Sequence, residues 1–404
     1  MARQVFEGVK VAEFGWAAVG PLHGVYLAHH GATVIHIESS HRLDINRTVP
    51  PYKDGKPGIN RSVYYEQAES GKYGITLNLN HPQGVEIAKQ IVAWADVVIE
   101  NFTPGVMKRW GLDYESIKKI KPDIIMLSSC NQGQTGPDAT QPGYGPDLAS
   151  LSGFTHLAGW QDRDPVAIYG AYTDYIAPKF GVTALIAALD YRRRTGKGLY
   201  LDLSQYECGL QFLAPVILDY TVNHRQARRM GNYCPYASPH GAYRCQGEDR
   251  WCAIAVFSDE EWQSFCQVIG NPAWTRDPRF ATQLDRVKAS EELDRLVEEW
   301  TIHHSAEEVM SLMQKAGVAA GVVATSRDLY QDPQLKHRHY LVELEHPEMG
   351  KHLCDSPFGG LSKTPGQPRM SSPCLGQHNE YVYKELLGGC DEEYTKLLSA
   401  GVFD

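Results

Sequence analysis

The segment from Val9 to Glu38 constrains the fold more than any other part of the sequence. It reads VKVAEF, then the turn GWAAVG, then PLHGVYLAHHG, then ATVIHIE. The apolar runs at both ends are typical of buried strands, and the stretch between them indicates a helix that ends at Gly31. Such a βαβ unit predicts an α/β fold with a parallel sheet, covered by helices and binding its ligand at the carboxyl ends of the strands.

The turn after the first strand bears on whether the ligand is a dinucleotide. Gly15 and Gly20 are present, but the GxGxxG pattern that lets backbone approach a pyrophosphate is absent. Glu38 stands where a dinucleotide fold places a ribose-binding acid, although acids are common at the ends of strands. An NAD-dependent enzyme is therefore retained only as an alternative.

Residues 40–73 form a polar, Pro- and Gly-rich segment that is too long for a simple connection. Its length predicts a functional loop. Lys72, which follows the small residues Ser70 and Gly71, is a candidate contact for a phosphate group. A solvated loop lysine without such a role is the alternative.

Residues 165–204 contain the strongest candidate for a reactive side chain. Asp174 is the single acid in an uncharged run that leads into a helix with Val182, Leu185 and Leu189 on one face. Gly196 is expected to end this helix, and LYLDLS alternates as a strand does. We expect Asp174 on the loop before the helix, where it serves either as a nucleophile or simply as the helix cap.

Composition narrows the class of protein. The chain of 404 residues is 43% hydrophobic and 22% charged, which is typical of a globular protein of two or three domains. A net charge of −9 argues against nucleic-acid and anionic-membrane partners, and no apolar run is long enough to span a membrane. The nine cysteines form no CxxC pair, so no metal site is predicted. We expect a cytoplasmic protein.

The pattern of elements predicts three parts. Residues 1–224 continue the α/β repeats and form the first part of a large domain. Residues 225–325 contain short strands and capped helices such as SAEEVMSLMQKAG, which predict a smaller α+β domain. Residues 326–404 are expected to return to the large domain.

Five stretches, taken in order, carry a family signature: GVKVAEF…GPLHGVYLAHHGATVIHIE, ENFTPGVMKRWGLDYESI, SSCNQGQTGP, GAYTDYIAPKFGVTALIAALDYRRRTGKG and LGQHNEYVYKELLG. Together they resemble the class III CoA-transferases. This family contains formyl-CoA transferase, the carnitine CoA-transferases and, as a divergent branch, the α-methylacyl-CoA racemases. The resemblance implies a Rossmann-like large domain and an interlaced dimer, either of identical chains or with a paralogous subunit.

The resemblance implies that Asp174 is the nucleophile and that CoA thioesters are substrates, with no permanently bound cofactor. Attack on an acyl-CoA would give a mixed anhydride, and returning CoA thiolate would leave an aspartyl-CoA thioester for the acceptor acid to resolve. Backbone N–H groups of the Gly-rich stretches and Gln132 are candidate donors to the oxyanion. A catalytically silent partner subunit is the rival that the presence of Asp174 argues against.

The resemblance also indicates where CoA binds. Lys72 and Arg109 have an independent physical case, because cations complement the phosphates of CoA. Ser39 and Asn80 stand where family members often carry basic residues, which puts phosphate contacts there in doubt. The remaining implied contacts are Ala18, Val19, Leu77, Asn101 and Phe102.

Two positions separate the transferases from the racemases. The racemases need a histidine where this chain has Tyr144 and a glutamate where it has Ser258. Neither side chain is a suitable base near neutral pH, so a racemase is the alternative and not the main prediction. We expect Tyr144 to hydrogen-bond a carboxylate substrate.

Aromatic residues guide the prediction of substrate. Trp16, Tyr144, Trp160, Tyr172 and Tyr175 fall in the stretches expected to form the pocket and favour a flat apolar acyl group. Within the family, GYGPDLASLSGFTHLAGW and GAYTDYIAPKF are most similar to succinyl-CoA:benzylsuccinate CoA-transferase subunits of anaerobic toluene breakdown. We therefore predict succinyl-CoA as donor and an aromatic dicarboxylate such as benzylsuccinate as acceptor. Oxalate and carnitine are alternative acceptors, and packing against a dimer partner is an alternative role for the aromatic residues.

Overall fold

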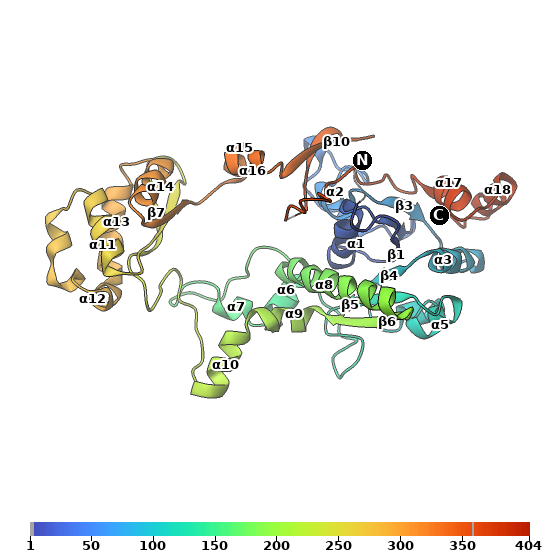
Figure 1. Cartoon of the computed structure of the whole chain (residues 1–404), viewed down its shortest axis with the longest axis horizontal. Helices are drawn as coiled ribbons and strands as arrows, with labels where there is room; N and C mark the ends of the chain where they lie inside the picture. Colours follow the sequence, from blue (N-terminus) through green and yellow to red (C-terminus); the bar gives the residue numbers. More distant parts are fainter. Residues whose placement is uncertain (1–3, 358) are drawn as a thin grey trace. The chain divides into compact units, whose positions relative to one another are not determined.

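The computed structural model describes residues 4–357 and 359–404, which form two compact units (Figure 1). The sheet unit comprises the chain up to Phe154, Ala167–Arg225 and Gln334–Asp404. The small unit comprises Thr155–Val166 and Gln226–Pro333. The domain boundaries drawn from the sequence, after residues 224 and 325, stay a prediction. The units differ from them mainly by assigning residues 155–166 and 326–333 to the small unit.

The sheet unit is built on a six-stranded sheet in the order β3-β2-β1-β4-β5-β6. Every neighbouring pair is parallel, which confirms the predicted α/β fold. The strands are β1 (Lys10–Glu13), β2 (Thr33–Glu38), β3 (Tyr73–Thr76), β4 (Val97–Glu100), β5 (Ile125–Cys130) and β6 (Leu199–Ser204).

Helices cover both faces of this sheet, as the continuous apolar strands require. Along β4, Val97 packs in a cluster with Leu27 of α1 (Val19–His29) and Leu185 of α8 (Tyr172–Thr195). Val98 points the other way and packs in a cluster with Ile91 of α3 (Pro82–Trp94). The alternation places α1 and α8 on one face and α3 on the other.

Helix α8 begins earlier than predicted, because its first turn already includes Asp174. The predicted loop position of Asp174 is therefore wrong. Pro178 lies inside the helix and has no N–H to donate to the carbonyl of Asp174, a feature that in sequence reads as a helix boundary. The predicted end is confirmed, since Gly196 caps the helix with φ of +71°.

The C-terminal segment packs against the edge strand β3. The backbone N–H of Thr76 donates to Asn379 Oδ1 at 2.8 Å, and that of Asn78 donates to the Val402 carbonyl at 2.9 Å. The segment contains the antiparallel hairpin of β10 (Leu341–His346) and β11 (Gly350–Asp355). Residues distant in sequence thus complete one unit.

The small unit contains an antiparallel sheet in the order β7-β8-β9, with helices packed on it. Ser258 caps α11 by accepting from the N–H of Glu261, and Ser305 caps α14 by accepting from the N–H of Glu308. The predicted capping serine at 305 is therefore confirmed. The elements are β7 (His240–Arg244), β8 (Trp251–Ala255), α11 (Asp259–Val268), α12 (Gln283–Lys288), α13 (Ser290–Thr301), α14 (Ala306–Lys315), β9 (Ala319–Val322) and α15 (Ser326–Gln331).

Shorter helices complete the chain. None of the helices in the described part of the chain is long and apolar enough to cross a membrane. The shorter helices are α2 (Val63–Glu69), α4 (Val106–Arg109), α5 (Tyr114–Ile120), α6 (Gly145–Leu151), α7 (Phe154–Leu157), α9 (Gln205–Phe212), α10 (Ala214–Asn223), α16 (Pro333–His337), α17 (Asn379–Tyr381) and α18 (Asp391–Ser399).

Candidate active site

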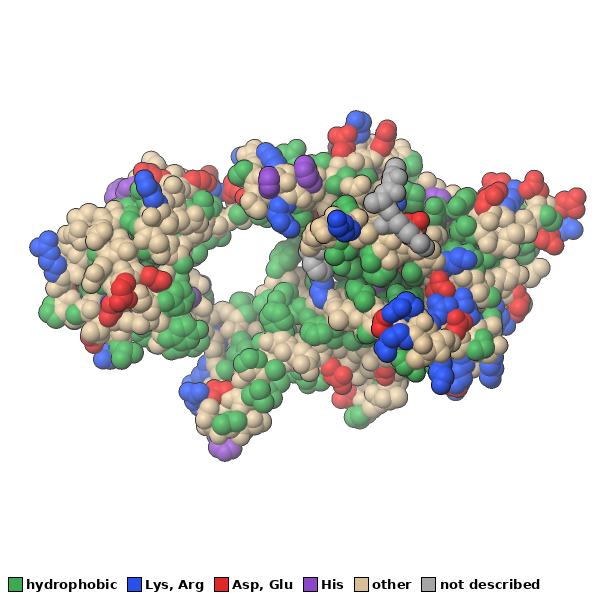
Figure 2. All heavy atoms as spheres, in the orientation of Figure 1, with side chains coloured by type: hydrophobic (Ala, Val, Ile, Leu, Met, Phe, Trp, Pro, Cys, Tyr) green, Lys and Arg blue, Asp and Glu red, His purple; other side chains and the backbone are tan. Residues whose placement is uncertain are grey.

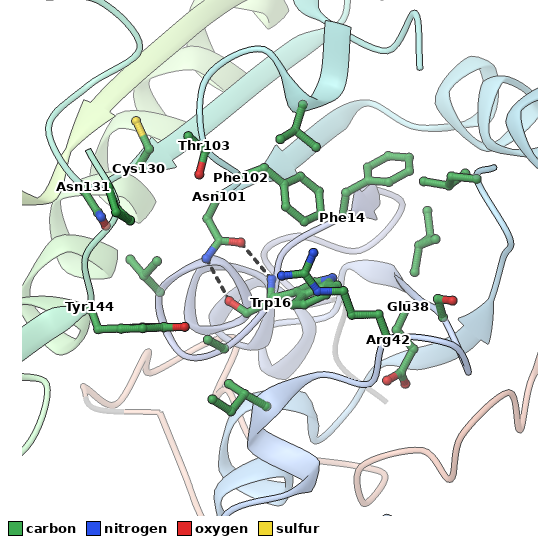
Figure 3. Close-up of a pocket in the computed structure, with 18 of the residues that line it drawn as sticks. Phe14, Trp16, Glu38, Arg42, Asn101, Phe102, Thr103, Cys130, Asn131 and Tyr144 are labelled. Carbon is green, nitrogen blue, oxygen red and sulfur yellow. Dashed lines mark hydrogen bonds between the residues drawn. The ribbon is translucent and has the colours of Figure 1, made fainter. Parts of the chain in front are cut away.

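The sheet unit contains a cavity of about 1040 Å³ beside the carboxyl ends of its central strands (Figure 3). This is the position in which a βαβ unit places its ligand. A cavity of this size is large enough for an extended cofactor-sized molecule. Most of the wall comes from segments 16–19, 41–43, 77–80, 101–104 and 141–144, with Asp174 from α8.

Asp174 contributes a carboxylate to the cavity wall. Within the described residues it has neither an ion pair nor a side-chain hydrogen bond, and burial raises its pKa to about 7. The N-cap of α8 is Ala171, and no side chain caps the helix there, so Asp174 does not serve as the cap. A half-buried, unpaired acid beside a cavity is typical of a reactive group rather than a structural one.

The start of α6 packs directly against the start of α8. Thr173 Oγ1 donates to the Gly145 carbonyl at 3.1 Å. A Cβ on Gly145 would lie 2.4 Å from the Cβ of Ala171 and 2.9 Å from Asp174 Oδ2. Only glycine therefore permits this approach, which positions the Asp174 carboxylate and places the exposed Tyr144 ring on the same cavity wall.

Two arginines bring positive charge to the cavity. Arg42 and Arg109 both line it, and neither side chain has an ion pair or hydrogen bond within the described part of the chain. The Arg42 guanidinium lies 4.6 Å from the centre of the Trp16 ring (Figure 3). Arg109 was predicted from the sequence. Arg42 was missed, because nothing in the sequence indicates which way a side chain of the 40–73 segment points.

The cavity brings together most of the predicted site residues. Tyr144 and Asp174 line it, and so do the residues expected to contact CoA, other than Lys72. The Asn101 side chain also fixes the backbone of Trp16, through two hydrogen bonds of 2.8 Å each (Figure 3). The lining residues among the predicted contacts are Ala18, Val19, Leu77, Asn101, Phe102 and Arg109.

Two predicted residues do not reach the cavity. Lys72 is fully buried, with Nζ 2.7 Å from Glu13 Oε1 and 3.0 Å from Glu69 Oε2, so its ammonium is neutralised inside the protein and not offered to a phosphate. Gln132 lies outside the set of residues that line the cavity, which leaves its predicted oxyanion role without support.

The aromatic pocket predicted from the sequence is only partly present. Trp16 and Tyr144 line the cavity. Tyr172 instead packs edge-on against Phe154, with ring centres 5.2 Å apart. Trp160 belongs to the small unit, where it packs against the backbone of Gly231. Tyr175 does not line the cavity. Two of the five aromatic residues therefore line the cavity, and Tyr172 and Trp160 pack elsewhere.

One buried cluster has the composition of a metal site. Donor atoms of Glu13, His36 and Glu69 lie within 4.8 Å of one another. The Lys72 ammonium already occupies the cationic position among these groups. Burial lowers the pKa of His36, but the charge of Glu69 and the hydrogen bond to Glu13 outweigh it and raise the pKa to about 9. The contacts of Lys72 with both carboxylates therefore account for this cluster without a metal ion.

Comparisons with a family model, with known proteins and with a solved structure all indicate the same protein family. The family model for CoA-transferase family III matches residues 6–379. Succinyl-CoA–D-citramalate CoA-transferase of Chloroflexus aurantiacus is 31% identical over 97% of this chain and 96% of its own length. Human succinyl-CoA:glutarate CoA-transferase is 30% identical over 98% of this chain and 90% of its own length. The crystal structure of a CAIB/BAIF family protein from Brucella suis is 31% identical and superimposes with a TM-score of 0.87, covering 95% of this chain and 100% of that chain.

Proposed function

The chain belongs to CoA-transferase family III, and from this premise we propose that Asp174 carries CoA between succinyl-CoA and a dicarboxylate acceptor. The observation that supports this role is the unpaired Asp174 carboxylate beside a cavity of about 1040 Å³. Two relatives named as succinyl-CoA-dependent enzymes support the choice of donor.

The proposed reaction has two symmetrical halves. An Asp174 carboxylate oxygen attacks the thioester carbonyl of succinyl-CoA, and the C–S bond breaks to release CoA thiolate and leave a mixed anhydride. The thiolate then attacks the Asp174 acyl carbon, which releases succinate and forms an aspartyl-CoA thioester. The acceptor carboxylate attacks this thioester and repeats the sequence in reverse, so that acyl activation is kept and no water is consumed.

The environment of Asp174 suits this chemistry. Because no cation or hydrogen-bond donor of the described residues stabilises the ionised carboxylate, its negative charge is poorly solvated and more nucleophilic than that of an exposed aspartate.

The activity is expected to depend on the ionisation of Asp174. Burial raises the pKa of its carboxyl to about 7. Only the ionised form is a nucleophile, so kcat/KM for succinyl-CoA should fall as the pH drops through about 7 and level off above it. Initial rates measured from pH 5 to 9 test this. A profile that stays flat down to pH 5 would contradict it.

Arg42 and Arg109 are proposed to bind the phosphates of CoA, because both guanidinium groups lie on the cavity wall and neither has an ion pair among the described residues. We expect Arg42→Gln to weaken binding of CoA by about 10-fold, since one charge-assisted contact is lost. Binding of pantetheine, which lacks the phosphates, should not change. Calorimetric titration of both ligands makes the comparison, with Arg193→Gln on the exposed end of α8 as the matched control. An equal loss for the two ligands would count against a phosphate contact.

The acceptor is proposed to be a dicarboxylate. Citramalate and glutarate, the acids in the names of the two relatives, are both short dicarboxylates. Benzylsuccinate is also a dicarboxylate and stays a prediction, although only Trp16 and Tyr144 of the predicted aromatic set line the cavity. A competition assay tests the choice of acceptor: the enzyme receives succinyl-CoA and equal concentrations of six acids, and mass spectrometry identifies the CoA esters formed. The acids are glutarate, D-citramalate, L-malate, benzylsuccinate, oxalate and carnitine. Preference for oxalate or carnitine would contradict the proposal.

An interlaced dimer stays part of the proposal. The same transfer assay should be run on the purified chain alone and with a co-expressed paralogous chain. Full activity of the chain alone, with a molecular mass of twice 45.1 kDa in light scattering, is the result expected for a homodimer.

A further inference from the structure

The turn between β1 and α1 contains a backbone conformation that its sequence does not favour. Ala17 has φ of +56°, in the left-handed region that residues with a Cβ rarely adopt. Ala17 and its neighbours from Trp16 to Val19 form one wall of the cavity. Strain of this kind persists only where surrounding contacts impose it, and it concentrates at functional sites.

The contacts that impose it come from one short segment. The N–H of Ala17 donates to both carboxylate oxygens of Asp44, at 3.1 Å each. The carbonyl of Ala17 accepts from Asn46 Nδ2 at 2.7 Å. Asp44 Oδ1 also accepts from the N–H of Asn46 at 2.8 Å, which fixes the carboxylate relative to the amide. Both polar groups of the Ala17 backbone are therefore held by Asp44 and Asn46.

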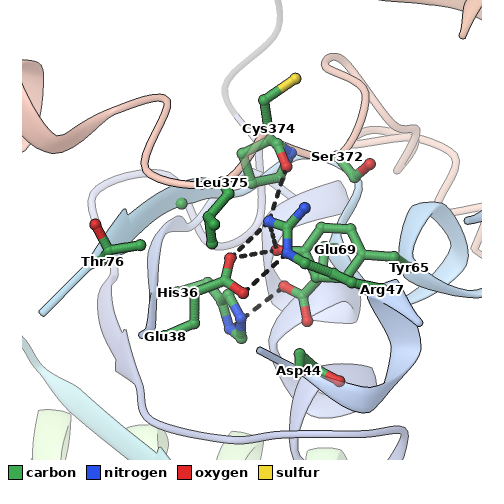
Figure 4. A network of polar contacts seen from close by, with 12 residues as sticks. His36, Glu38, Asp44, Arg47, Tyr65, Glu69, Thr76, Ser372, Cys374 and Leu375 are labelled. Carbon is green, nitrogen blue, oxygen red and sulfur yellow. Dashed lines mark hydrogen bonds and ion pairs between the residues drawn. The ribbon is translucent and has the colours of Figure 1, made fainter. Parts of the chain in front are cut away.

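The segment that holds Ala17 is itself anchored in the core. Arg47, the next residue, is buried and forms a bidentate ion pair with Glu38, with Nη2 2.6 Å from Oε1 and Nε 2.9 Å from Oε2 (Figure 4). It also donates to the Pro373 carbonyl at 3.1 Å. Asp44 is fully buried beside this network. The anchor leaves the Asp44 carboxylate little freedom to follow Ala17 if the turn moves.

The position of this turn bears on Asp174. Helix α1 begins at Val19, immediately after the turn, and packs on α8. The approach of the two helices is close, because a Cβ on Gly181 of α8 would lie 2.0 Å from His23 Nε2 of α1. A change in the turn would therefore alter the cavity wall beside Asp174, while the close contact of α1 with α8 keeps the helix that carries Asp174 in place.

We propose that Asp44 and Asn46 are positioning residues for the bound thioester, which hold Ala17 in its left-handed conformation so that residues 16–19 form the wall that CoA contacts. This inference rests on the proposed CoA transfer. Neither residue is required to touch the ligand, since both act through the Ala17 backbone.

The test uses glycine to relieve the strain. Asp44→Ala removes both acceptors of the Ala17 N–H, so the left-handed turn should lose population and the Kd for CoA should rise about 10-fold. The KM for succinyl-CoA should rise with it while kcat changes less than about two-fold. Ala17→Gly in the same chain should restore Kd to within about two-fold of wild type, because glycine adopts positive φ without a steric penalty.

Two outcomes would overturn the inference. One is wild-type CoA affinity in Asp44→Ala, and the other is a weakened affinity that Ala17→Gly does not restore. If Asp44→Ala does not fold, Asn46→Ala with and without Ala17→Gly provides the same comparison. Asp190→Ala, which removes an exposed acid of α8, is the matched control. The wild-type protein and its Asp174 variant test CoA transfer itself, so failure of the proposed function is seen separately.

Discussion

Replacement of Asp174 by asparagine is expected to lower the rate of CoA transfer by at least about 1000-fold, the scale of loss when a covalent nucleophile is removed. Asparagine has nearly the same shape but cannot form an anhydride or a CoA thioester. Because the Asp174 carboxylate makes no side-chain hydrogen bond or ion pair within the described residues, the substitution should leave the fold intact. Steady-state transfer from succinyl-CoA and circular dichroism measure the two effects.

The stability of this variant provides an independent check. Burial raises the pKa of Asp174 from its ordinary value near 4 to about 7 in the folded protein. The folded state thus binds the proton more tightly than the unfolded state, and the contribution of Asp174 to stability falls as the pH rises through this range. At pH 8 we expect Asp174→Asn to melt no lower than wild type. If Asp174→Asn transfers CoA at a rate within ten-fold of wild type, Asp174 is not the nucleophile. A large loss of stability in this variant would indicate a structural role for Asp174.

The second large effect is expected at Arg47. Its guanidinium is buried with Glu38, Tyr65 and the Pro373 carbonyl, so Arg47→Met leaves the Glu38 carboxylate buried without its partner (Figure 4). Removal of one member of a buried ion pair costs about 3 to 5 kcal/mol of unfolding free energy. Urea denaturation followed by circular dichroism measures this loss.

A matched pair of variants separates the buried ion pair from general effects of losing an arginine. Glu38→Gln added to Arg47→Met should recover part of the stability, because no buried charge then remains unpaired. Arg193→Met breaks an exposed pair with Asp190 and should produce no measurable change. Equal losses for Arg47→Met and Arg193→Met would contradict the importance assigned to burial.

The parts of the fold that the sequence predicted are those with strong local patterns. The apolar runs and Gly31 identify the first βαβ unit, and Gly196 marks the end of α8. The start of α8 was not predictable from local rules, because Pro178 usually marks a helix boundary and here is accommodated inside the helix. The packing of Asn379 on Thr76 depends on residues about 300 positions apart, which no local pattern encodes.

The candidate active site, like the fold, was predictable where a local pattern exists and not where it depends on contacts between distant residues. Asp174 stood out as an isolated acid, and it lines the cavity. Lys72 was assigned to phosphate from its charge, but Glu13 and Glu69 enclose it, and their proximity arises only when the strands and α2 assemble. Arg42 was missed for the opposite reason, since its approach to Trp16 depends on the path of the 40–73 segment.

The most direct test of the account is detection of the covalent intermediate. The protein is incubated with succinyl-CoA, treated with hydroxylamine and digested with trypsin, which releases residues 164–179 between Arg163 and Phe180. We predict a hydroxamate on Asp174, located by fragmentation, because hydroxylamine attacks the aspartyl-CoA thioester at the Asp174 acyl carbon. The label should be absent without succinyl-CoA and in Asp174→Asn. A labelled Asp164, or an unlabelled peptide from protein that is turning over, would contradict the proposed nucleophile.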